Sequence, residues 1–174
     1  MDGYRETDVR KIDDNVFSMI ADSWMLVTAG GMDSYNTMTA SWGAMGELWS
    51  AKVAFAFVRP QRHTFGFMNR AGRFTLSFFE EEHRDALKYC GSHSGRDVDK
   101  AAATGLSPFQ PAPDTVSFRQ SRLILVCRKI YFQDLDPKNF LEDFIEDKYP
   151  EKGYHRMYVG EIEKALESIE PSTG

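Results

Sequence analysis

The strongest constraint on the fold is an alternation of apolar and hydroxyl-bearing side chains near the middle of the chain. Phe74, Leu76 and Phe78 alternate with Thr75 and Ser77. A period of two places the apolar members on one face of a strand and the hydroxyls on the other. The segment therefore predicts a β-strand with one apolar face, and the rest of the chain has to supply strands that pair with it.

Further segments rich in β-branched or aromatic residues predict strands over 24–29, 52–58, 122–133 and 155–165. Capping residues, glycines and apolar spacing predict helices over 61–71, 82–90, 98–103 and 136–150. Gly72 and Gly91 are expected to end the first two of these helices, and the Asp136-Pro137 pair to begin the last. Asp13 or Asp14 would cap a short helix before the first strand, after a frayed or disordered segment over 1–12.

Helices inserted among strands, without strict alternation, indicate a mainly β fold with flanking helices and argue against a doubly wound sheet. No internal repeat or low-complexity linker interrupts the chain. We therefore predict a β-barrel decorated by helices, in a single domain over residues 1–174.

The overall charge restricts the partners. A formal net charge of −5 and a pI near 5.4 argue against nucleic-acid binding, which depends on neutralising many phosphates. No apolar run approaches the roughly twenty residues that cross a bilayer, and the N-terminus is charged, so we expect no membrane association and a cytoplasmic location. Cys90 and Cys127 form no CxxC pair and are expected to be free thiols.

Several familiar chemistries have no support in the motifs. The chain has no glycine-rich dinucleotide fingerprint and no P-loop. In residues 91–95, which are spaced like a nucleophile elbow, His93 stands where the serine should be. The four histidines are scattered without the spacing of a zinc helix, and Cys90 with His93 is half a metal site at best, so we predict no metal.

Basic and hydroxyl side chains gather at turns beside the predicted strands. They are suited to a phosphomonoester, because arginine can hold two oxygens at once while lysine and threonine add further donors. The alternative is that these arginines are simply solvated. The candidate phosphate ligands are Arg59, Arg62, Thr64, Arg96 and Lys100.

Four motifs in order resemble the flavin reductase-like, flavoredoxin-type family of FMN-binding split barrels. The run 36–42 is similar to the family's flavin-contacting strand and loop, and 59–64 to its phosphate-binding turn. Residues 74–79 resemble the strand that follows, and residues 94–100 the loop and helix that the family brings to the cofactor. The resemblance extends from Trp24 to the terminal strand near Ile162.

The resemblance implies an antiparallel Greek-key split barrel that forms a homodimer and holds FMN near the subunit interface. It assigns the isoalloxazine or ribityl contacts to Asn36, Thr37, Met38, Thr39 and Ser41, and the phosphate end to Arg59, Arg62, Thr64, Arg96 and Lys100. Ser94, in the loop brought to the cofactor, is a further cofactor-binding residue. Trp42 is either a wall of the flavin site or a core residue, and Asn36 either a ligand or a turn residue. His155 is the candidate catalytic residue, with a structural role as its alternative, because Tyr154 replaces the aspartate that often precedes it.

Three functions fit this resemblance. The first is an NAD(P)H-dependent flavin reductase whose bound FMN accepts hydride and passes electrons to free flavin, iron or another acceptor. The second is a flavoredoxin-like carrier reduced by a protein partner. The third is a non-catalytic flavin-binding or storage protein. The fold alone does not distinguish them.

Overall fold

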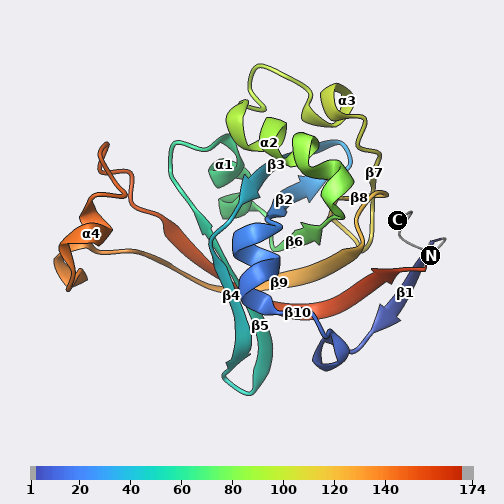
Figure 1. The fold of residues 1–174 in the computed structure, drawn as a ribbon, viewed down its shortest axis with the longest axis horizontal. Helices are drawn as coiled ribbons and strands as arrows, with labels where there is room; N and C mark the ends of the chain where they lie inside the picture. Colours follow the sequence, from blue (N-terminus) through green and yellow to red (C-terminus); the bar gives the residue numbers. More distant parts are fainter. Residues whose placement is uncertain (1–2, 170–174) are drawn as a thin grey trace.

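In the computed structural model, which describes residues 3–169, one antiparallel sheet curls into a barrel (Figure 1). Seven strands follow one another in the order β3-β2-β6-β9-β10-β5-β4, and β1 pairs with β10. The strands are β1 (Tyr4–Thr7), β2 (Met25–Gly31), β3 (Ser34–Ala40), β4 (Gly43–Leu48), β5 (Ala51–Val58), β6 (Arg73–Phe78), β9 (Leu123–Asp134) and β10 (Arg156–Ser168). The predicted barrel with inserted helices is confirmed.

The alternation in β6 is confirmed, and both of its faces are buried. Phe74, Leu76 and Phe78 lie in the main apolar core. On the other face, the Thr75 hydroxyl donates to the Val116 carbonyl oxygen at 2.6 Å. The short strands β7 (Pro108–Phe109) and β8 (Ser117–Phe118) belong to the segment that covers this face. The hydroxyls are therefore paired inside the protein and do not face solvent.

Three helices gather at one end of the barrel (Figure 1): α1 (His63–Arg70), α2 (Arg84–Ser92) and α3 (Lys100–Thr104). The expectation that Gly91 ends the second helix is wrong, because α2 runs through it to Ser92. A Cβ at Gly91 would lie 3.3 Å from the Thr39 Cβ. This glycine therefore serves close packing of α2 on β3.

The N-terminal segment differs from the expectation of fraying, although residues 1–2 lie outside the described residues. Tyr4 begins β1, and its hydroxyl lies 2.9 Å from the Ser121 carbonyl oxygen. The following helical segment is capped by neither predicted aspartate. The Asn15 Oδ1 instead accepts from the backbone N–H of Phe17 at 3.0 Å, and Asp14 pairs with Arg122. The segment continues as a π-helix (Ser18–Asp22).

The long helix predicted over 136–150 is also wrong. Asp136 does cap a turn, but that turn is a 3-10 helix (Pro137–Asn139), and the only α-helical piece that follows within the described chain is α4 (Asp143–Glu146). Leu141 and Phe144 are 91% and 62% exposed. This excursion, which we call the arm (residues 135–155), projects from the barrel in Figure 1. Phe140 packs on Tyr149, but Leu141 and Phe144 find no cover among residues 3–169, so a long helix would gain little from packing.

Candidate functional site

The polar run that follows Tyr35 is mostly strand. Asn36 is 6% exposed within β3, so the turn alternative is wrong. The chain then passes through Ser41 and Trp42 directly into β4. This places the predicted ligands of β3 beside the β5–α1 connection and the C-terminal end of α2.

Two cavities adjoin at this place. The wider one has a volume of about 440 Å³ and the other, which we call the basic cavity, about 160 Å³. Both are lined by Met38, Gln61 and Arg62, so they lie side by side, and we call the two together the groove. The wider cavity is also lined by Thr39, Ser41, Trp42, Phe57, Arg59, Gly91, Glu151 and His155. The basic cavity is also lined by Asn36, His63, Thr64, His93, Ser94, Gly95, Arg96 and Lys100.

Arg62 lies at the junction of the two cavities. Its guanidinium is half-buried, and within residues 3–169 it makes no hydrogen bond or ion pair with any other side chain or carbonyl. Burial, together with the neighbouring Arg59, lowers its pKa from the ordinary value. A fixed cation without an internal partner is suited to bind an anion that enters the groove.

Lys100 forms the floor of the basic cavity and is only 6% exposed. Its Nζ donates to the carbonyl oxygens of Thr37 at 2.8 Å and Cys90 at 2.7 Å. Burial lowers the pKa of this ammonium to about 8. Lys100 therefore joins β3 to α2 and contributes positive potential from below, with two of its three donors already engaged.

Asn36 and Thr64 form an internal pair. The Asn36 Nδ2 donates to the Thr64 Oγ1 at 2.7 Å, and Thr64 is fully buried. A Cβ at Gly95 would lie only 1.8 Å from the Asn36 Oδ1. Glycine at this position therefore lets the loop that carries Ser94 and Arg96 lie directly on β3.

Two predicted threonines also have partners inside the protein. The Thr37 hydroxyl lies 2.8 Å from that of Thr28, and Thr37 lines neither cavity. The Thr39 hydroxyl donates to the Leu87 carbonyl oxygen at 2.5 Å, although Thr39 does line the wider cavity. Of the hydroxyl groups in this run, that of Ser41 is exposed at the cavity wall.

An aromatic group closes the other end of the wider cavity. The Trp42 and His155 ring centroids are 5.0 Å apart, and Trp42 is 44% exposed, which favours the wall over the core alternative. The His155 Nδ1 lies 2.8 Å from the hydroxyl of Tyr149. Burial, with a smaller effect of Arg59, lowers the pKa of His155 to about 4, so the imidazole is neutral near pH 7.

Arg59 lies at the edge of the wider cavity, away from the basic one. Its Nη2 donates to the Lys148 carbonyl oxygen at 2.8 Å, and its guanidinium lies 5.2 Å from the Tyr149 ring centroid. Arg59 therefore holds the arm against the barrel. Of the predicted phosphate ligands, the structure brings together Arg62, Thr64, Arg96 and Lys100, with Ser94 beside them, and it separates Arg59 from them.

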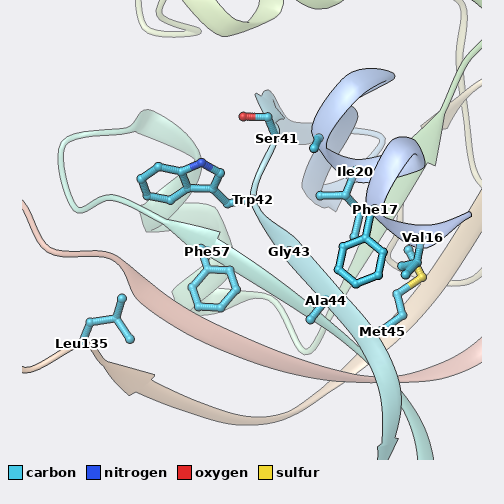
Figure 2. Close-up of a pocket in the computed structure, with 11 residues that line it drawn as sticks. Val16, Phe17, Ile20, Ser41, Trp42, Gly43, Ala44, Met45, Phe57 and Leu135 are labelled. Carbon is cyan, nitrogen blue, oxygen red and sulfur yellow. The ribbon is translucent and has the colours of Figure 1, made fainter. Parts of the chain in front are cut away.

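A third cavity of about 500 Å³ shares Ser41, Trp42 and Phe57 with the groove. Figure 2 shows Trp42 and Phe57 on one side of it and Phe17, Ile20 and Val16 on the other. No charged side chain lines it, and Phe17 is 80% exposed. We call it the apolar pocket.

The sequence motifs missed several lining residues. Gln61 and His63 lie within the motif 59–64 but were not assigned a role. Tyr149, which lines neither cavity but contacts His155, lies in a segment predicted as a plain helix. Gly95 lies within the motif 94–100 and was also given no role, although its lack of a Cβ makes room for the Asn36 side chain. Within residues 3–169, no three His, Cys, Asp or Glu side chains are placed to hold a metal ion, and both cysteines are buried and unpaired.

The donor set fits a flat, phosphorylated ligand. A phosphate would find Arg62, Arg96 and the Lys100 floor in the basic cavity, and a ring system would find Trp42 and Met38 in the wider one. A split barrel with such a groove belongs to the class of flavin-binding redox barrels. The flavin reductase-like domain matches residues 17–171, and the chain belongs to that family. A flavin-related redox function and an oxidoreductase class follow from this membership.

Solved structures share the fold at low sequence identity. Flavoredoxin from Methanosarcina acetivorans is 20% identical with a TM-score of 0.66, over 84% of this chain and 69% of that one. An FMN-binding protein from Thermus thermophilus with bound p-hydroxybenzaldehyde is 21% identical with a TM-score of 0.67, over 83% and 71%. The NADH:FAD oxidoreductase SgcE6 from Streptomyces globisporus C-1027 is 16% identical with a TM-score of 0.64, over 83% and 75%.

These likenesses concern the fold alone. No curated protein sequence matches this chain significantly. Within residues 3–169, no helix has the length and apolar character needed to cross a bilayer.

Proposed function

We propose that the protein binds FMN in the groove and acts as an NAD(P)H-dependent flavin reductase. The observation that carries the proposal is Arg62, an internally unpartnered guanidinium at the point where a basic cavity meets an aromatic-walled one. FMN has a phosphate at one end and a planar ring at the other, in the same order as the two cavities. When bound, FMN would accept hydride and pass electrons on to free flavin, iron or another acceptor.

The chain's own residues would bind and orient the cofactor. Arg62 and Arg96 would hold the phosphate, with Ser94 as a neutral donor and Lys100 adding charge from the floor. Asn36, Thr37, Met38 and Thr39 would contribute through the backbone of β3 and its packing, since the hydroxyls and amide named above have internal partners. Trp42 would wall the ring, and His155 would face it as a neutral imidazole.

The remaining parts of the proposal concern the assembly and the cell. The proteins of similar fold include an FMN-binding protein, a flavoredoxin and an NADH:FAD oxidoreductase, and each activity belongs to the protein so named. We propose a cytoplasmic, single-domain chain that works as a homodimer. The exposed apolar side chains beside the groove support a second copy as partner.

Substitution of Arg62 with alanine tests the site. Loss of a charge-assisted contact to phosphate costs about 1.5–3 kcal/mol, so the Kd for FMN should rise about ten- to a hundredfold. Flavin fluorescence quenching during titration measures this. Arg70→Ala is the matched control, because Arg70 is on α1 with its guanidinium over the Phe67 ring and lines neither cavity. Equal affinity in Arg62→Ala and wild type, with both folded, would reject the assignment.

An anaerobic reaction distinguishes the reductase from the carrier. The FMN-loaded protein is mixed with NADH and, separately, with NADPH, while the visible flavin absorbance is followed. Bleaching within seconds supports the reductase. If neither nucleotide bleaches the flavin but a ferredoxin-like donor does, the protein is a flavoredoxin-like carrier.

A further inference from the structure

The arm supplies a hydrogen-bond partner for the histidine of the groove. Tyr149 is 3% exposed, and its hydroxyl lies 2.8 Å from the His155 Nδ1. Among residues 3–169 the phenol proton of Tyr149 has no other acceptor, although the backbone N–H of His155 also acts as a donor to the phenol oxygen. The geometry of this one contact therefore determines how both side chains place their protons.

Only one arrangement satisfies the tyrosine. If the His155 Nδ1 carried the proton and donated to Tyr149, the buried phenol proton would have no acceptor, which costs free energy. If Tyr149 donates to an unprotonated Nδ1, both groups are satisfied. The imidazole proton then lies on Nε2, the nitrogen that Tyr149 does not contact.

Several contacts hold the tyrosine in place. Arg59 donates to the carbonyl oxygen of Lys148 at 2.8 Å and covers the Tyr149 ring. The Phe140 ring stacks on the Tyr149 ring with 5.9 Å between their centroids, and the Tyr154 and Tyr149 ring centroids are 5.1 Å apart. Tyr149 is therefore fixed between the barrel and the rest of the arm, and the phenol oxygen is held at the imidazole.

We propose that Tyr149 is a positioning residue that fixes His155 as the Nε2–H tautomer, so that the wider cavity presents a neutral N–H donor to a carbonyl or anionic acceptor on a bound ligand. His155 lines that cavity against Trp42. The identity of the ligand as a flavin or nicotinamide rests on the proposed function. The tautomer itself does not.

Nuclear magnetic resonance of the flavin-free protein tests the tautomer directly. Long-range proton–nitrogen correlations of the imidazoles, with the His155 signals identified by their loss in His155→Gln, report which nitrogen is protonated. We expect protonated Nε2 and unprotonated Nδ1 in the wild type, and a mixture of both tautomers in Tyr149→Phe. Protonated Nδ1 in the wild type, or an unchanged tautomer in Tyr149→Phe, would overturn the proposal.

Tyr154→Phe is the matched control. It removes a hydroxyl from the same aromatic group, but that hydroxyl donates to the Glu146 carboxylate at 2.8 Å and does not contact His155. The His155 signals should stay as in the wild type. If both variants shift them equally, the effect comes from general loosening of the arm, and the positioning role is rejected.

A second measurement tests the donor role. In Tyr149→Phe the Kd for FMN or the KM for the nicotinamide should rise about fivefold, the loss expected for one misoriented neutral hydrogen bond, while Tyr154→Phe changes neither. A tautomer change without either effect would reject the ligand contact. If the protein binds no FMN, the proposed function is rejected. The tautomer proposal would still be tested by the magnetic resonance spectra alone.

Discussion

At the residue scale, the environment of His155 leads us to expect that the protein loses stability in acid. Burial and Arg59 lower its pKa from the ordinary 6.5 to about 4 in the folded protein. Between these values the unfolded chain binds more protons than the folded one. The free energy of unfolding should therefore fall as the pH decreases from 6.5 to 4, by up to about 3 kcal/mol from this group.

Urea unfolding at pH 7 and pH 4.5 measures this change. His155→Gln should lose less stability between the two values than the wild type, because glutamine does not titrate. His93→Gln is the control, since it removes an exposed histidine that does not contact His155. An identical pH dependence in the wild type and His155→Gln would show that folding does not lower the pKa of His155.

Single residues also show how far the sequence could predict the site. Arg62 and Arg96 were predicted from their chemistry and turn-like context, and Ser94 from the family resemblance, and the structure brings the three into one cavity. The internal partners of Thr37 and Lys100 were not predictable. A hydroxyl or ammonium group suits a ligand and a buried polar group equally. The pairing of β2 with β3 decides the case of Thr37, and the packing of α2 on β3 that of Lys100.

At the element scale, β10 passes close to two core side chains at its irregularity after Val159. A Cβ at Gly160 would lie 2.5 Å from the Phe74 Cζ and 2.7 Å from the Cys127 Cβ. Gly160→Ala should therefore destabilise the barrel by about 1–3 kcal/mol, through displacement of packed groups. Denaturant unfolding at neutral pH measures the loss.

Gly46→Ala is the matched control for this prediction. Gly46 is also in a strand, β4, but a Cβ there meets no atom within 4 Å. The free energy of unfolding of Gly46→Ala should equal that of the wild type or be slightly higher, since alanine restricts the unfolded chain more than glycine does. If Gly160→Ala were as stable as Gly46→Ala, β10 would accommodate the added methyl group without loss of stability, and the predicted effect of the clash with Phe74 and Cys127 would be wrong.

Strands were predicted better than helices for a physical reason. Alternation in β6 and the long apolar run of β9 report burial directly, so both strands were found within a residue or two. The spacing of Phe140, Leu141 and Phe144 indicates an amphipathic helix, but it does not show which surface would cover the apolar face. The sequence therefore predicted a long helix where the barrel offers no surface, and it missed β1, whose pairing with β10 is set by contacts far along the chain.

At the scale of the whole molecule, closure of the barrel brings distant segments together. β10 pairs with β1, β5 and β9, so it joins the first strand of the chain to its middle. The groove depends on this topology, because Asn36 comes from β3, Arg62 from the β5–α1 connection and His155 from the end of the arm, directly before β10. The order of motifs predicted the family, but only the fold shows which of their side chains meet.

The proposed homodimer gives the last prediction. Leu141 and Phe144 on the arm are 91% and 62% exposed, and the apolar pocket beside the groove exposes Phe17 by 80%. A second copy of the chain that covers these surfaces would gain about 25 cal/mol for each Å² of apolar area removed from water. Light scattering during size-exclusion chromatography should therefore give twice the chain mass for the wild type.

Aspartates at both arm positions, in the double variant Leu141→Asp and Phe144→Asp, should shift the protein toward the monomer, because each would bury a charge in the interface. Met32→Asp, at an exposed position in the turn between β2 and β3, is the control and should leave the mass unchanged. A wild-type monomer would reject the dimer itself. A double variant that remains a dimer would instead place the interface away from the arm, and the apolar pocket with Phe17 would then be the surface to substitute.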